Sequence, residues 1–162
     1  MKGDTLFLGY WEKAGVRRPV NEAGWMVTRD RGHWKEDGAL QILGRLDNML
    51  ISGGENIQPE EIEDVLQQHH NVSQALVVAV EDEEYGQRPA AFVQWREEKN
   101  ADIEELKAFL GQTLARFKIP EHFLNWPSES MTTGFKVHRA SFQALAEESL
   151  AQTRMDCDKK EA

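Results

Sequence analysis

The chain has 162 residues, 40% of them apolar and 29% charged, which suits a folded globular protein with one domain, or one small domain and an extra piece. Its formal net charge of −9 and its isoelectric point of about 5.1 argue against a general binder of nucleic-acid backbones or of anionic membrane surfaces. The single cysteine, Cys157, excludes an internal disulfide or a cysteine metal cluster. We expect a cytoplasmic protein, because the chain has no apolar run long enough to cross a bilayer and no signal-peptide pattern.

Residues 1–43 are predicted to form two or three short antiparallel strands, because short apolar runs alternate with glycines there. Asp37-Gly38 precedes the apolar run Ala39–Leu43 and is typical of a hairpin turn. This stretch has no amphipathic helix to cover the strands, and a small uncovered sheet is only marginally stable. We therefore expect residues 1–43 to be the edge of a larger body.

Residues 44–150 are predicted to form a self-contained α+β unit. It opens with a strand from Asp47 to Ile51, after which Gly53-Gly54 make a turn. A helix follows, because Pro59 suits a first helical position and acidic residues crowd the first turns. The apolar face of this helix, at the spacing i, i+3, i+4 and i+7, comprises Ile62, Val65, Leu66 and His69.

Two buried strands come next, Ser73–Val80 and Ala90–Trp95, joined by an acidic turn. Asp102 caps a helix, with Glu105 completing a capping box. The apolar face of that helix is expected to continue to Phe117, before Pro120. The remaining predicted elements are an edge strand at 122–126, a loop or short hairpin at 131–137, a last helix from Arg139, and a fraying tail at 151–162.

Few residues indicate chemistry by themselves. The chain has no nucleophile elbow, no phosphate-binding loop ending in lysine and no zinc-spaced set of His and Cys. The adjacent His69 and His70 are expected to diverge on a helix, so we predict no metal site. Gly53-Gly54 fit a tight turn or a surface along which a ligand slides. Lys136 lies in a glycine-containing loop, where a solvated charge and a catalytic group are both open.

Four segments resemble the adenylate-forming acyl-CoA synthetases, a superfamily shared with peptide-synthetase adenylation domains and luciferases. They are GYW followed by EAGWMVTRD, then GRLDNMLISGGENIQPEEIE, LARFKIP and FKVHR. Their order and spacing fit the C-terminal end of those enzymes over roughly residues 4–150. The resemblance implies an α+β fold: a three-stranded sheet with packed helices and a hairpin, preceded by the last strands of a large N-terminal domain.

The resemblance also implies roles for single residues. Asp30 matches an aspartate that binds the ribose hydroxyls of ATP, and Arg45 matches an arginine that reaches the ribose or phosphates. Asp47 matches the hinge about which the small domain rotates. Lys136 matches the lysine that enters the site for adenylation. The chain departs from the family pattern at two places where glycine is usual, Arg29 and Phe135.

Ser52, Gly53 and Gly54 match the loop that lines the tunnel for the pantetheine arm of CoA, where glycines let the backbone approach a thin ligand. The implied substrates are ATP, CoA and a small carboxylic acid. Mg²⁺ is implied as well, held mainly by the large domain. The implied partner is the protein's own N-terminal domain, with neither nucleic acid nor membrane.

Within the superfamily, SGGENIQPEEIE and EEYGQRP resemble most the o-succinylbenzoate–CoA ligases of menaquinone synthesis, while benzoate-type and medium-chain acid ligases share SGGENI. We predict that the chain is a fragment, inactive alone: residues 1–43 are the terminal strands of the missing large domain, 44–150 the mobile C-terminal domain, and 151–162 a tail. Two alternatives stay open, an adenylation domain that loads a carrier protein and a stand-alone binding module without catalysis.

Overall fold

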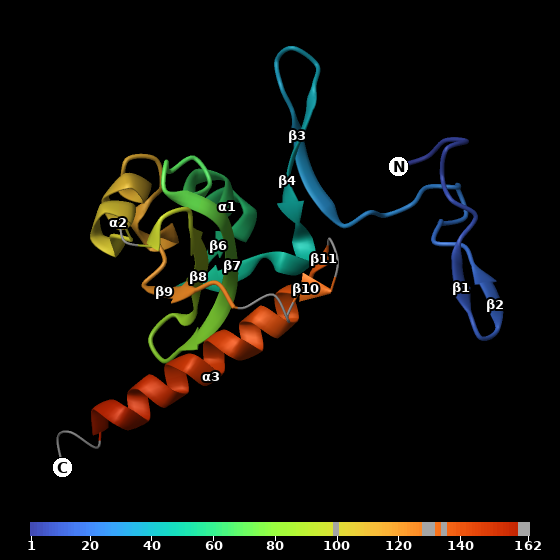
Figure 1. Cartoon of the computed structure of the whole chain (residues 1–162). Helices are drawn as coiled ribbons and strands as arrows, with labels where there is room; N and C mark the ends of the chain where they lie inside the picture. Colours follow the sequence, from blue (N-terminus) through green and yellow to red (C-terminus); the bar gives the residue numbers. More distant parts are fainter. Residues whose placement is uncertain (99–100, 128–131, 134–135, 159–162) are drawn as a thin grey trace.

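The computed structural model describes residues 1–98, 101–127, 132–133 and 136–158. Two separate hairpins come first, and a mixed unit of sheet and helices follows (Figure 1). No helix in these described ranges is both long and apolar enough to cross a membrane.

The N-terminal part forms two antiparallel hairpins, so four short strands replace the two or three expected. The strands are β1 (Tyr10–Glu12), β2 (Gly15–Arg17), β3 (Asp30–Trp34) and β4 (Leu40–Arg45). The predicted turn at Asp37-Gly38 joins β3 to β4, with Gly38 at φ 83°. In Figure 1 the β3–β4 hairpin projects away from the sheet and helices that follow.

None of the first 49 residues is buried. Large apolar side chains are instead open to solvent, among them Trp11 at 85% and Trp34 at 73% exposure. The hydrophobic core begins at Leu50, and every core residue lies at or after it. This part of the chain therefore has strands but no interior of its own.

The C-terminal unit contains a five-stranded sheet with β8 at its centre. Its strands are β5 (Leu50–Ser52), β6 (Glu55–Ile57), β7 (Val72–Asp82), β8 (Gly86–Trp95) and β9 (His122–Asn125). β7 and β8 form a long antiparallel pair, while β9 runs parallel to β8. A parallel pair needs a crossover, and the segment that contains α2 (Ile103–Gly111) supplies it. The β5–β6 hairpin pairs with β8 through Ser52 and Gly86. The sheet therefore has five strands instead of the expected three.

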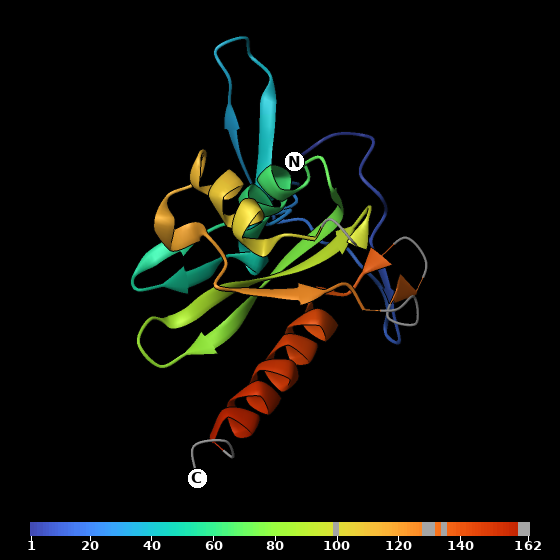
Figure 2. The same cartoon turned by 60° about the vertical axis from the view of Figure 1, so that its left-hand side comes forward.

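Side chains of β7 and β8 alternate between two cores. Val77 and Ala91 face the core shared with α1 (Pro59–Leu66) and α2. Leu76 and Phe92 face the core shared with α3 (Arg139–Asp158), where the Phe92 and Phe142 rings meet edge to face at 5.0 Å. Figure 2 shows α1 and α2 on one side of the sheet and α3 crossing the other. Helices therefore cover both faces.

Local sequence signals account for the helix starts. Pro59 occupies the first turn of α1 as predicted, and the Asp102 carboxylate accepts hydrogen bonds from the backbone N–H groups of Glu104 and Glu105. The prediction for the end of α2 was wrong: the helix stops at Gly111, because glycine has a low helix propensity. Phe117 consequently lies beyond the helix and is 43% exposed.

The C-terminal part contains a short hairpin and a helix that is longer than predicted. The segment around 131–137 is a hairpin of β10 (Thr132–Thr133) and β11 (Lys136–Val137). Helix α3 then runs through Asp158, eight residues into the stretch expected to fray.

Candidate functional site

The three residues assigned to ATP and the hinge lie together at the base of the β3–β4 hairpin. Asp30 and Arg45 are cross-strand partners, and a guanidinium nitrogen of Arg45 lies 3.8 Å from the Asp30 carboxylate. Arg45 also donates a hydrogen bond to Asp47 at 3.0 Å, which raises the pKa of its guanidinium. The structure thus brings all three residues into one polar cluster at the turn that follows β4.

Asp47 lies in a 3₁₀ turn, η1 (Leu46–Asn48), so the predicted strand from Asp47 was wrong at its start. Asp and Asn are turn formers whose side chains compete with strand pairing. The Asp47 carboxylate also binds Arg29 at 2.7 Å. The turn separates β4 from β5, a suitable place for a backbone pivot.

Arg29, which stands where the family usually has glycine, has a backbone conformation that favours glycine. Its φ is +63°, the only positive φ at a non-glycine residue among those described. This conformation costs roughly 1–2 kcal/mol for a residue with a Cβ and little for glycine. A glycine is therefore the better backbone here, and Arg29 offers an exposed ion pair with Asp47 in exchange.

Comparing Arg29→Gly with Arg29→Ala isolates that backbone cost, because both variants lose the ion pair. The N–H of Leu46 donates to the Arg29 carbonyl at 2.8 Å and reports local opening. We expect this amide to exchange about 5- to 30-fold more slowly in Arg29→Gly than in Arg29→Ala, the ratio for 1–2 kcal/mol. Equal exchange rates in the two variants would contradict the argument from φ.

Gly53 and Gly54 form the two-residue turn between β5 and β6. Their φ values, 57° and 87°, fit a type I′ turn, in which both central residues need positive φ. A Cβ on Gly53 would lie 3.0 Å from the Tyr85 ring, and the N–H of Gly53 donates to the Tyr85 carbonyl at 2.9 Å. The turn therefore packs closely against the β7–β8 turn, as a tight-turn interpretation requires.

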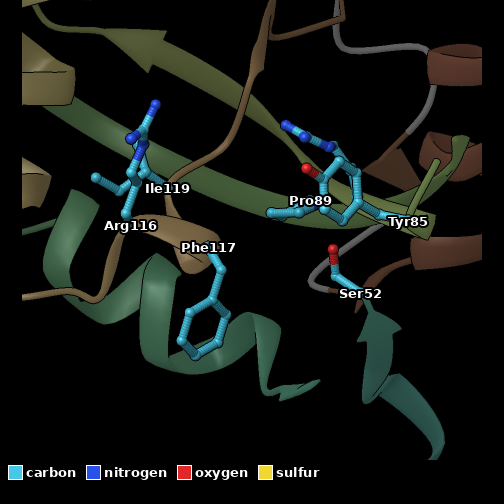
Figure 3. Close-up of a pocket in the computed structure, with 7 residues that line it drawn as sticks. Ser52, Tyr85, Pro89, Arg116, Phe117 and Ile119 are labelled. Carbon is cyan, nitrogen blue, oxygen red and sulfur yellow. The ribbon is translucent and has the colours of Figure 1, made fainter. Parts of the chain in front are cut away.

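A pocket of about 500 Å³ opens beside this turn. It is lined by Ser52, Tyr85, Arg88, Pro89, Arg116, Phe117 and Ile119. Figure 3 shows Ser52 and Tyr85 on one side and Arg116 and Phe117 on the other. The walls thus offer two aromatic rings and two guanidinium groups.

Charge and aromaticity are combined at Tyr85. The Arg88 guanidinium lies 4.2 Å from the centre of the Tyr85 ring, a cation–π arrangement. Glu84 raises the pKa of the Tyr85 phenol by hydrogen bonding and by its charge. A planar ring with a phosphate attached would find both a stacking surface and cations here.

The sequence prediction assigned only Ser52 of these pocket residues a role, although two quoted segments, EEYGQRP and LARFKIP, contain the other six. Phe117 was interpreted as helix core because its spacing continues that of α2. The signal that the prediction overlooked is Gly111, where α2 ends. Arg116 and Phe117 consequently lie beyond the helix, in a 3₁₀ turn.

Lys136 is the first residue of β11, and its backbone pairs with Thr133. Phe135, the other departure from the family pattern, lies outside the described residues, as does Gly134. Three residues after Lys136, Arg139 begins α3.

The prediction that His69 and His70 diverge was wrong. Helix α1 ends at Leu66, so both lie in a turn with ring centres 4.5 Å apart, and Glu105 is 3.7 Å from His69 Nε2. The three could in principle surround a metal. However, His69 Nδ1 accepts from the N–H of Asn71 at 3.4 Å, whereas a metal-bound histidine normally donates from its second nitrogen. This favours a proton on Nε2 facing Glu105.

Comparisons with known proteins agree with the resemblance. Residues 61–136 match the family model described as AMP-binding enzyme C-terminal domain. A 2-succinylbenzoate–CoA ligase of Haemophilus influenzae is 46% identical over 140 residues, 86% of this chain and 30% of the relative. The chain belongs to the adenylate-forming acyl-CoA synthetase superfamily. The Escherichia coli 2-succinylbenzoate–CoA ligase is 43% identical over 91% of the chain and 31% of its own length.

Solved structures of this superfamily have the same fold. Escherichia coli MenE with bound OSB-AMS matches with a TM-score of 0.76 and 40% identity, over 87% of this chain and 30% of that one. The o-succinylbenzoate CoA synthetase of Bacillus subtilis, in complex with its acyl-adenylate intermediate, matches with a TM-score of 0.73 and 32% identity over 88% and 29%. The chain thus spans about 30% of the length of the superfamily members it matches.

Proposed function

We propose that this chain is the C-terminal part of an ATP-dependent carboxylic acid–CoA ligase, and that the acid is 2-succinylbenzoate, an intermediate of menaquinone synthesis. The observation that carries the proposal is 43–46% identity to two 2-succinylbenzoate–CoA ligases over most of the chain. The reaction has two halves. ATP and the carboxylate give an acyl adenylate and pyrophosphate, and the thiolate of CoA then displaces AMP.

The proposed organisation places residues 1–43 at the end of the large domain and 44–150 in a mobile small domain. Its support is the distribution of burial: none of the first 49 residues is buried, and the core begins at Leu50. Exposed tryptophans in β1 and β3 need a covering body, since large exposed apolar surface usually marks an interface. The large domain is that body in this proposal.

In the adenylation half, Lys136 supplies positive charge between the attacking carboxylate and the α-phosphate. Asp30 accepts hydrogen bonds from the ribose hydroxyls, and Arg45 remains charged beside it. The carboxylates of Asp30 and Asp47 both lie within 4 Å of an arginine, so they fit a hydrogen-bonding role better than Mg²⁺ ligation. We therefore assign Mg²⁺ to the large domain.

In the thioester half, the Gly53-Gly54 turn borders the path of the pantetheine arm, and the adjoining pocket receives the nucleotide end of CoA. The support is chemical: Tyr85 and Phe117 offer rings for adenine, and Arg116 offers a cation for phosphate. Carbon side chains at the turn would narrow the path, because Gly53 already approaches Tyr85 closely.

A chimera tests the proposal. The 162 residues would replace the matching C-terminal part of the Haemophilus influenzae relative, and AMP and thioester formation would be measured with 2-succinylbenzoate, ATP and CoA. We expect activity from the chimera and none from the 162 residues alone. Release of AMP by the chain alone, or a folded chimera without either half-reaction, would refute the proposal. Activity with benzoate but not 2-succinylbenzoate would refute the assigned acid.

A further inference from the structure

The start of α3, just after Lys136, is fixed by an ion-pair network that the proposed mechanism does not use. Arg139 donates from Nη1 to Glu63 at 2.7 Å and also to the Val77 carbonyl, and its Nη2 lies 3.6 Å from Glu60. All three charged side chains are largely shielded, with exposed fractions of 23% for Arg139, 12% for Glu63 and 22% for Glu60. Burial strengthens such a network and makes its loss costly.

Glu63 completes this anchor from the other side. Its Oε1 also accepts from the Val77 N–H at 2.7 Å, so Arg139 and Glu63 together pair with both backbone groups of one β7 residue. Arg139, two residues after β11, is therefore attached to α1 and to β7 of the five-stranded sheet. This fixes the chain directly after β11, the strand that begins with Lys136 and is called the lysine strand below.

Glu60 extends the network to the hinge. The Asn48 side-chain amide, in the hinge turn η1, donates to Oε1 of Glu60. The Gln58 amide donates to Oε2 at 2.6 Å and also to the Arg45 carbonyl at 2.9 Å, at the end of β4. Asn48 and Arg139 therefore share one oxygen, Oε1, of the same carboxylate.

The carboxylate of Glu60 is well suited to this position. Burial alone would raise its pKa, but the two amide hydrogen bonds, the backbone N–H and the Arg139 charge outweigh burial and hold the pKa of Glu60 below its ordinary value. Backbone approach is close too: a Cβ on Gly44 would lie 2.5 Å from the Glu60 carboxylate and 2.4 Å from the Gln58 amide. The end of β4 thus rests directly on this carboxylate.

We propose that Glu60 and Arg139 are positioning residues for adenylation, which fix the lysine strand relative to the hinge turn through one shared carboxylate oxygen. This inference rests on the proposed function. Lys136 must reach the site with its charge placed to within a fraction of an ångström, and a misplacement of about 1 Å can cost about 100-fold in rate. The thioester half-reaction does not use Lys136, so it should be insensitive to the network.

The primary variant is Glu60→Gln in the full-length protein, because it keeps the shape and removes the charge. Its matched control is Glu61→Gln, the adjacent residue of α1, whose carboxylate binds Lys118 at 2.7 Å instead. We expect Glu60→Gln to lower the rate of ATP–pyrophosphate exchange by about 10- to 100-fold. Thioester formation from supplied adenylate should change less than about 2-fold, and the control should leave both half-reactions unchanged.

A double-mutant cycle separates positioning from general stability. Asn48→Ala removes the hinge contact, and Arg139→Lys weakens the lysine-strand contact while keeping a charge. Because both act on Oε1 of Glu60, we expect their effects on exchange to be non-additive by about 3-fold or more. Additive effects, equal losses in both half-reactions, or an unchanged Glu60→Gln would overturn the inference. A wild-type protein without exchange activity would instead refute the proposed function.

Discussion

Replacing Lys136 by alanine in the full-length protein is expected to lower the rate of acyl-adenylate formation by about 100- to 1000-fold, the usual loss when one fixed group that stabilises developing charge is removed. Lys136 stands at the start of β11, directly before the anchored start of α3. ATP–pyrophosphate exchange measures this half-reaction. Thioester formation from supplied adenylate and CoA should stay within about 2-fold of wild type, because in the proposed mechanism the charge acts on the α-phosphate during the first step only.

The control for this experiment is Lys107→Ala. Lys107 pairs with Glu104 on the exposed surface of α2 at 2.9 Å, and such pairs contribute little. It should change neither half-reaction. If Lys136→Ala slowed both half-reactions to the same extent, the role assigned to Lys136 would be wrong.

Replacing Gly53 by leucine is expected to slow thioester formation by about 10- to 100-fold while leaving adenylate formation nearly unchanged. Two physical effects combine at this position. Gly53 has φ 57°, where a side chain costs roughly 1–2 kcal/mol, and its Cβ would meet the Tyr85 ring at 3.0 Å. A leucine therefore displaces Tyr85 into the pocket or projects into the path of CoA. Single-turnover rates with supplied adenylate measure the effect.

Gly38→Leu is the matched control for the backbone term. Gly38 also lies in a hairpin turn with positive φ, 83°, but a Cβ there meets no atom within 4 Å. Both variants should lose stability to a similar extent, and only Gly53→Leu should lose thioester formation. Normal thioester formation in Gly53→Leu would leave the glycine as a requirement of the turn alone.

Much of the C-terminal fold follows from local signals in the sequence. Pro59 and the acids after it predict α1, Asp102 predicts the start of α2, and the β-branched run around Val77 predicts a buried strand. These signals act between residues close in sequence, so they do not depend on tertiary contacts and can be read from the sequence alone. The family resemblance added the order of the functional segments.

The errors occurred where tertiary contacts decide. The predicted strand from Asp47 to Ile51 begins too early, because the Asp47 carboxylate pairs with Arg29 and Arg45 in a turn. His69 and His70 were placed on a helix that ends earlier. In both cases one partner of the side chain, Arg29 for Asp47 and Glu105 for His69, is far away in the sequence, and the local spacing of residues does not reveal it.

The pocket illustrates the same limit for function. Tyr85 comes from the β7–β8 turn and Arg116 from the segment after α2, and only the parallel pairing of β9 with β8 brings them to one cavity. Their residue types were visible in the sequence, but their neighbourhood was not. The resemblance assigned roles to Asp30, Arg45 and Asp47, but that they form one cluster, with Arg29 as a fourth member, is a finding of the structure.

The confinement of the hydrophobic interior to residues after Leu50 has a mechanical consequence. In the proposed mechanism the C-terminal unit rotates between two orientations on the turn at Leu46–Asn48, and its core need not repack because every core residue lies after that turn. The barrier to such a swing then comes from a few polar contacts across the pivot, such as the Gln58 amide on the Arg45 carbonyl. Small changes at those contacts should therefore alter how fast the two orientations exchange while leaving the melting temperature of the body almost unaffected.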